Sequence, residues 1–153
     1  YLRFGRPKVP NFTPENQTFK IGKALTLEEG RDVSIFATGH LVWESIEAKK
    51  TLDKKGISAE IINIHTIKPL DEQTVIESVQ KTGCVVTAEE HMMLGGLGES
   101  IAQLLARKIP TPLEMVAVND SFGESGKPNE LMKKYGLTSE NIVAACEKVL
   151  SRK

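Results

Sequence analysis

The sequence predicts an α/β fold: a three-layer αβα arrangement around a five-stranded mixed sheet, with four parallel strands and one antiparallel edge strand. Two patterns lead to this prediction. From about residue 32 onward, short runs of consecutive apolar residues alternate with longer stretches that are apolar at helical spacing. Strands that are apolar on both faces are typical of a parallel sheet covered by helices on each side. Before them, residues 19–27 mostly alternate between apolar and polar, as an edge strand does.

The N-terminal part of the chain divides into a linker and this edge strand. Residues 1–18 include Pro7, Pro10 and Pro14, and such a density of proline is typical of a linker. The predicted edge strand closes at a turn in residues 28–32. Because only this tight turn separates it from the next strand, we expect the two to pair antiparallel.

The predicted elements then follow in regular alternation. Residues 32–39 form a buried strand, and residues 41–55 form a helix that ends at Gly56, since glycine readily adopts the left-handed conformation that closes a helix. The next strand covers residues 58–64. The helix after it begins near Asp71, whose carboxylate can accept hydrogen bonds from the first helical N–H groups.

The second half of the chain repeats this alternation. Residues 83–90 predict the third buried strand, and residues 112–119 the fourth. Pro128 suits the first turn of a short helix, and the last helix begins near Thr138. Between the two strands lies a helix whose inward positions share helical spacing: Leu97, Ile101, Leu104 and Leu105.

The composition excludes two classes of partner. The 153 residues suffice for one domain, and twenty Lys and Arg balance twenty Asp and Glu. Without a basic excess we expect neither nucleic acid nor a membrane surface as a partner, and no apolar run reaches the ~18 residues of a membrane span. Cys84 and Cys146 are expected to be buried, reduced thiols, in keeping with a cytoplasmic protein. Because the chain starts at Tyr1, we expect it to be a piece of a longer or trimmed protein.

The segment "EEHMMLGGLGES", residues 89–100, raises the question of a phosphate-binding loop. Gly96 and Gly98 supply the first two glycines of G-x-G-x-x-G, but Ile101 stands at the third position. Glu99 lies in the first helical turn, where a phosphate would otherwise meet the backbone N–H groups. We therefore expect no nucleotide to bind at this turn.

Three histidines suggest a metal site, which the spacing does not support. His40, His65 and His91 each follow a predicted strand, and the carboxyl ends of parallel strands meet at one edge of the sheet, where such folds bind ligands. No HxxxH or CxxC pair accompanies them, so we predict no metal site. Glu89 and Glu90 could form a proton relay. We favour the simpler interpretation that one braces the glycine turn and the other is solvated, and we assign no catalytic residue.

Several segments together resemble the C-terminal domain of transketolase. In order, they are "VSIFATGHLVWESIEAKK" (33–50), "IKPLD" (67–71), a strand ending in "EEH", and "GGLGE" (95–99). The segment "SGKPNELMKKYGLTSENI" (125–142) is similar to the end of transketolase specifically. The chain looks most like the separate C-terminal section of a split transketolase. The alternatives within this thiamine-diphosphate-dependent group are 1-deoxyxylulose-5-phosphate synthase and the beta subunit of a 2-oxoacid dehydrogenase, a partner-docking module.

The resemblance implies part of an enzyme that transfers a two-carbon ketol unit between phosphorylated sugars. The family uses thiamine diphosphate and a divalent metal, Mg or Ca, which its other domains bind. The GDG metal motif of those domains does not occur in this sequence. We therefore expect this piece to bind no cofactor and to be inactive alone, as a scaffold and dimerisation domain. Its expected partners are the remaining transketolase domains or an N-terminal subunit, in a homodimer.

The resemblance also implies a domain boundary and one binding residue. Residues 1–18 are expected to be the end of the preceding pyrimidine-binding domain and a linker, and residues 19–153 the C-terminal domain. The stretch "YLRFGRP" resembles the one in which transketolases carry an arginine that grips the sugar phosphate, which places this role on Arg6. A guanidinium suits the role because it offers two parallel donors to a phosphate. Arg3 is the less favoured substitute.

Overall fold

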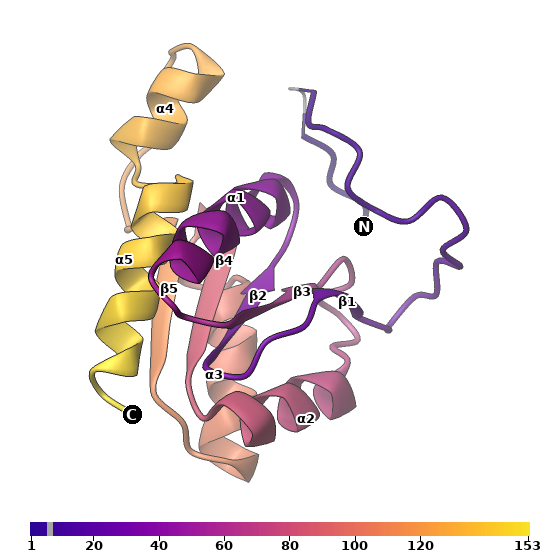
Figure 1. Ribbon diagram of the computed structural model, residues 1–153. Coiled ribbons are helices and arrows are strands. Elements are labelled where there is room, and N and C mark those ends of the chain that lie inside the picture. The colour runs from indigo at the N-terminus through magenta and orange to yellow at the C-terminus, as the bar shows by residue number, and fades with distance from the viewer. Residues whose placement is uncertain (6–7) are drawn as a thin grey trace.

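The computed structural model describes residues 1–5 and 8–153 and confirms the predicted fold class (Figure 1). Over these residues the sheet has the strand order β1-β3-β2-β4-β5. Strand β1 is antiparallel to β3, and the other pairs are parallel. The strands are β1 (Leu25–Glu28), β2 (Val33–Ala37), β3 (Ala59–Asn63), β4 (Val85–Met92) and β5 (Leu113–Val118).

Helices cover both faces of the sheet, so that a separate apolar core fills each side (Figure 1). Successive side chains of a strand point to opposite faces. In β2, Ile35 therefore packs on the side of α1 and α5, whereas Phe36 packs on the side of α2 and α3. The helices are α1 (His40–Lys54), α2 (Glu72–Thr82), α3 (Leu97–Lys108), α4 (Pro128–Lys134) and α5 (Ser139–Leu150).

The helix ends lie where the sequence signals predict them. The Asp71 carboxylate caps α2, accepting hydrogen bonds from the Thr74 N–H at 3.4 Å and the Thr74 hydroxyl at 2.9 Å. Gly56 follows α1 with a φ of 75°. Pro128 opens α4, and Thr138 is the residue before α5. The capping predictions are therefore confirmed.

The prediction for the edge strand was wrong about its length and about the strand with which it pairs. Strand β1 covers residues 25–28 alone, and it pairs with β3, not with β2. After β1 the chain crosses beneath the start of β3, where the N–H groups of Arg31 and Asp32 donate to the Ser58 carbonyl. Gly30 permits this crossing, because a Cβ there would lie 2.2 Å from the backbone of Ala59. Strand β3 therefore separates β1 from β2, and the short connection is not a hairpin.

Residues 19–24, predicted as the first half of that strand, form turn and irregular structure. The side chains that face them explain the difference. The Ala24 N–H donates to the Asp71 carboxylate at 3.0 Å and not to a neighbouring strand. The Phe19 ring lies 4.6 Å from the His65 ring, centroid to centroid. These contacts attach the segment to the carboxyl end of β3 and the start of α2.

Both cysteines are buried and unpaired, as the sequence indicates. Burial raises the pKa of the Cys84 and Cys146 thiols, so both are protonated at neutral pH. In the part of the chain that the structure describes, no helix combines the length and the apolar character needed to cross a membrane.

Candidate functional site

The histidines and glutamates that the sequence offered as an alternative metal or acid–base cluster lie at the carboxyl edge of the parallel strands. The structure brings only some of them together. The His40 Nδ1 and the Glu90 Oε2 lie 2.7 Å apart. The His65 Nδ1 instead contacts the Thr66 hydroxyl at 2.9 Å, and the His91 Nδ1 donates to the Met92 carbonyl at 3.0 Å. Within residues 1–5 and 8–153, no group of three or more His, Cys, Asp or Glu side chains could hold a metal ion.

Glu89 braces the turn between β4 and α3. Its side chain is buried, with the residue 1% exposed. Its two carboxylate oxygens accept hydrogen bonds from the N–H groups of Leu97 and Gly98, each at 2.8 Å. These are two of the donors that the first turn of a helix leaves without an intrahelical partner. The sequence interpretation, in which one glutamate braces the glycine turn, is confirmed for Glu89.

Glu99 occupies the same turn from the helix side. Its carboxylate accepts a hydrogen bond from the Gly95 N–H at 2.6 Å. The positive end of the α3 dipole therefore already faces two carboxylates of the chain itself. The residues of this turn do not fit the diphosphate of a nucleotide or of thiamine diphosphate, because two carboxylates stand at the turn and the N–H groups of Gly95, Leu97 and Gly98 already donate to them.

The glycines of the turn allow close packing. A Cβ at Gly98 would lie 2.7 Å from the Met115 sulfur and 2.9 Å from the Thr87 hydroxyl oxygen. A Cβ at Gly96 would lie 2.3 Å from the carboxylate of Glu89. Both positions therefore need glycine for helix α3 to approach β4 and β5.

The N-terminal segment crosses the same edge of the sheet. The Arg3 guanidinium donates to the Glu90 carbonyl through Nη1 at 2.6 Å. Gly5 lies against the imidazole of His40, where an added Cβ would be 2.5 Å from Cε1. Arg6, the predicted phosphate-binding residue, lies outside the described residues, and the described chain resumes at Lys8.

The group formed by Arg3, Gly5, His40 and Glu90 was missed at the sequence level. The sequence interpretation left one of the two glutamates solvated; Glu90 is 41% exposed at its side chain, but it is also paired with a histidine that is 13% exposed. Both residues follow or end predicted strands, but the sequence does not show that these two strands, β2 and β4, become neighbours. The contribution of residues 1–5 was not foreseeable, because nothing in a proline-rich segment shows where it lies.

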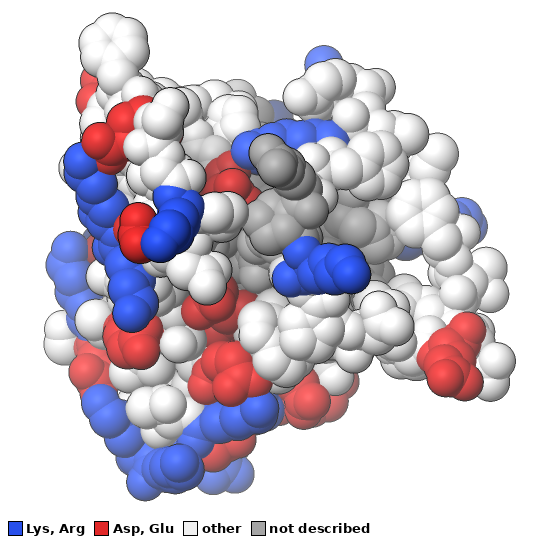
Figure 2. Space-filling model, turned by 90° about the horizontal axis from the view of Figure 1, so that it is seen from above, with Lys and Arg blue, Asp and Glu red and all other residues white. Residues whose placement is uncertain are grey.

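This edge also presents exposed apolar side chains. Figure 2, seen from above, shows the N-terminal segment on the right as a mostly uncharged surface, while basic and acidic side chains intermingle over the left and lower parts. The exposed apolar residues of the segment and of the loops after β3, β4 and β5 are Tyr1, Leu2, Phe4, Ile67, Leu94 and Phe122.

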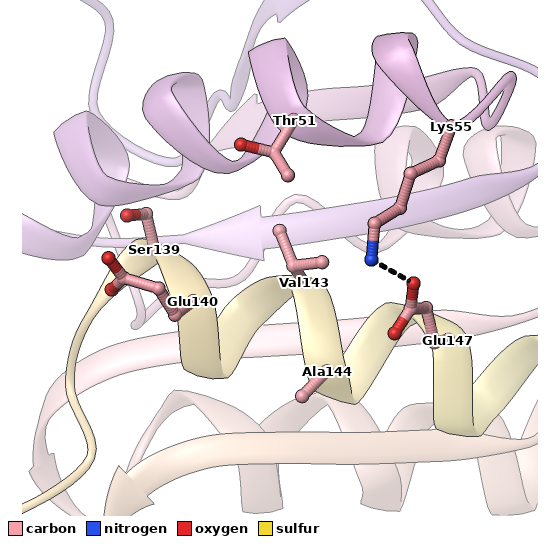
Figure 3. Close-up of a pocket in the computed structure, with 7 residues that line it drawn as sticks. All are labelled: Thr51, Lys55, Ser139, Glu140, Val143, Ala144 and Glu147. Carbon is pink, nitrogen blue, oxygen red and sulfur yellow. Dashed lines mark hydrogen bonds and ion pairs between the residues drawn. The ribbon is translucent and has the colours of Figure 1, made fainter.

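Two surface cavities lie away from this edge. One, of about 320 Å³, is a groove between α1 and α5, spanned by the ion pair of Lys55 and Glu147 (Figure 3). The other, of about 230 Å³, lies beside α2 and is lined by Glu29, Glu60 and Lys81, among others. Hydrogen bonds to both glutamates raise the pKa of Lys81, so this lysine stays charged. In both cavities, the lysine is paired with a glutamate of the lining.

The fold and this edge define a class of protein: an α/β domain with helices on both faces of its sheet. Its glycine turn allows close packing of α3, and two carboxylates of the chain accept hydrogen bonds from the N–H groups of that turn. Comparison with known families identifies the domain. The family model described as "Transketolase, C-terminal domain" matches residues 22–142. The chain therefore belongs to the transketolase C-terminal domain family.

Curated relatives include a transketolase subunit and a transketolase C-terminal section. The 6-deoxy-6-sulfo-D-fructose transketolase subunit SqwH of a Clostridium species is 46% identical over 153 residues, which is 100% of this chain and 48% of that protein. A putative transketolase C-terminal section of Methanocaldococcus jannaschii is 44% identical, over 84% of this chain and 40% of that protein. The chain thus spans about half the length of these curated relatives or less.

A solved structure and a second enzyme class are also similar. A split-gene transketolase described as an inactive beta4 tetramer superposes with a TM-score of 0.92 at 43% identity, covering 96% of this chain and 48% of the other. The 1-deoxy-D-xylulose-5-phosphate synthase 1 of Geobacter sulfurreducens is 37% identical, over 91% of this chain and 22% of that protein.

Proposed function

We propose that this chain is the C-terminal part of a transketolase, which in its complete form transfers a two-carbon ketol unit between phosphorylated sugars. One observation carries the proposal: the chain aligns over its full length, at 46% identity, with one half of a transketolase subunit. Thiamine diphosphate and a divalent metal, Mg or Ca, would bind to the other domains. The turn before α3 supports this division, because Glu89 and Glu99 already occupy the donors that a diphosphate would need.

The chain itself serves as a scaffold in this proposal. Residues 19–153 form the C-terminal domain, and residues 1–18 are the end of the pyrimidine-binding domain and a linker. The exposed apolar residues of the carboxyl edge would pack against the remaining domains or an N-terminal subunit, in a cytoplasmic homodimer. A piece of this kind lacks the cofactor site and has no ketol-transfer activity alone.

Arg6 is the proposed contact with substrate. A guanidinium can donate two parallel hydrogen bonds to the terminal phosphate of a sugar, and such charge-assisted pairs are stronger than neutral ones. The relative SqwH is named for a 6-deoxy-6-sulfo sugar, whose terminal group is a sulfonate. A sulfonate offers the same arrangement of oxygen acceptors. The proposed role is therefore recognition of a terminal anion, with phosphate as the first candidate and sulfonate as the second.

The test is Arg6→Ala in the complete enzyme, with fructose 6-phosphate, 6-deoxy-6-sulfofructose and fructose as donors. Loss of a charged hydrogen-bonding partner predicts a KM that rises roughly 10- to 100-fold for the anionic donors and changes little for fructose. The anionic donor with the lower wild-type KM identifies the substrate class. Equal effects on charged and uncharged donors would remove the anion-binding role.

A second candidate is supported by the synthase relatives at 36–37% identity. In that case the complete enzyme would make 1-deoxyxylulose 5-phosphate from pyruvate and a triose phosphate. Incubation with pyruvate and glyceraldehyde 3-phosphate separates the candidates, because a transketolase releases no CO₂ from this pair.

A further inference from the structure

We infer that His40 and Glu90 are positioning residues, which hold the N-terminal segment (residues 1–5) in place across the carboxyl edge and thereby fix the chain that leads into Arg6. The inference rests on the proposed anion-binding role of Arg6. In this inference, His40 and Glu90 of the C-terminal domain contribute to substrate recognition indirectly, by positioning Arg6. We call Arg3, Gly5, His40 and Glu90 the edge cluster.

Glu90 contacts the cluster with both its side chain and its backbone. Its Oε2 lies 2.7 Å from the His40 Nδ1, and its carbonyl oxygen accepts a hydrogen bond from the Arg3 Nη1 at 2.6 Å. His40 is the first residue of α1, and Glu90 belongs to β4. Both anchors therefore stand on regular secondary structure, which places side chains more accurately than a loop can.

Gly5 provides the second contact. Its backbone lies so close to the His40 imidazole that a Cβ would come within 2.5 Å of Cε1 and 2.9 Å of Nε2. The ring cannot easily turn away, because its Nδ1 is bonded to Glu90. Gly5 is also the residue directly before Arg6 in the sequence. The last described backbone position before Arg6 thus packs on a side chain that the C-terminal domain holds in a fixed orientation.

The arrangement predicts a specific kinetic effect. A small displacement of a binding group weakens the contacts that this group makes with the substrate. Contacts made by other groups are not affected by it. Disturbing the edge cluster should therefore weaken binding of an anionic donor, and leave the handling of an uncharged donor unchanged. A loss of general stability would affect both donors alike.

Three variants of the complete enzyme test this effect with fructose 6-phosphate and fructose. Gly5→Ala forces the segment away from the ring, and His40→Ala removes the ring. Both should raise KM for fructose 6-phosphate about three- to tenfold, with kcat and the KM for fructose within twofold of wild type. His40→Asn is the conservative variant: its amide can donate to Glu90 much as Nδ1 does, and it should restore most of the affinity. Lys8→Ala, which removes an exposed charge from the same stretch, is the matched control.

A structural readout accompanies the kinetics. Tryptic cleavage after Arg3 should be slow in wild type and faster in Gly5→Ala and His40→Ala, because the Arg3 side chain is bonded to the Glu90 carbonyl. Gly5 lies outside both apolar cores of the described chain.

The outcomes separate the two proposals. If Arg6→Ala impairs only anionic donors while Gly5→Ala and His40→Ala affect both donors equally or neither, the positioning role is overturned and the anion-binding role stands. If Arg6→Ala shows no preference for anionic donors, the anion-binding role fails and the positioning role fails with it. Faster cleavage after Arg3 would then still show that the cluster holds the segment.

Discussion

Single carboxylates decide what the carboxyl edge can bind. Glu89 is fully buried, and both of its oxygens are used by N–H groups of α3. An ionised carboxylate at a helix N-terminus is favourable, because hydrogen bonds to a charged acceptor are strong and the helix dipole adds to them. The same contacts use the N–H groups of Leu97 and Gly98, which a phosphate at this helix end would otherwise meet. One residue thus caps helix α3 and occupies two N–H groups that a phosphate would need.

We predict that Glu89→Ala lowers the free energy of unfolding by about 2–4 kcal/mol, because two buried N–H donors lose their acceptor. Glu89→Gln should cost about half as much, since the amide oxygen can still accept. Equilibrium unfolding in urea measures both. The control is Glu15→Gln on the exposed N-terminal segment, expected within about 0.5 kcal/mol of wild type. A wild-type-like Glu89→Ala protein would show that the brace is dispensable.

Residue chemistry alone predicted part of this edge. The place of Glu99 in the first turn of α3 was predictable, because it follows from the spacing of a known motif. The pairing of His40 with Glu90 could not be predicted, since it depends on which strands become neighbours. For the same reason the sequence left open which of the two glutamates braces the turn.

At the scale of the elements, helix ends are determined locally and sheet neighbours are not. Asp71, Gly56 and Pro128 each act on the backbone within a few residues, so their roles were predictable. The position of β1 depends on where the chain passes the start of β3, at the contact between Gly30 and Ala59. These two residues are separated in the sequence by helix α1, so their contact is not a local feature. Residues 19–24 mostly continue the apolar alternation, but β3, the neighbour of β1, ends at Asn63 opposite Leu25 and does not extend along them.

The start of α2 should make stability depend on pH. Burial opposes ionisation of Asp71, but hydrogen bonds from Ala24 and Thr74, together with Lys23, outweigh it and lower the pKa of this carboxyl. A group with a lowered pKa in the folded state stabilises the protein above its unfolded pKa of about 3.9, and this stabilisation is lost as the pH falls through the folded value.

We therefore expect Asp71→Asn to be about 1–2 kcal/mol less stable than wild type at pH 7, with the difference shrinking below about pH 4. Urea unfolding at several pH values measures this. Glu114, whose pKa is also lowered, is present in both proteins and cancels in the comparison. A difference that stays constant from pH 7 to pH 3 would show that the charge of Asp71 plays no part.

At the scale of the whole molecule, the chain is a folded domain with an exposed apolar edge and a family membership that covers residues 22–142. Its relatives are about twice its length or longer. In the described residues, the N-terminal segment is hydrogen-bonded to β4, and the N–H groups of the glycine turn are bonded to carboxylates of the chain itself. Both features suit a domain that supports an active site formed mainly by other parts of the enzyme.

The most direct test of this account is calorimetric titration of residues 1–153 with thiamine diphosphate and Mg²⁺, without and with the complementary transketolase polypeptide. We predict no binding heat from the chain alone. Once the complementary polypeptide is present, we predict cofactor binding together with ketol transfer from a donor with a terminal anion. Binding of thiamine diphosphate at micromolar affinity by the chain alone would contradict the account.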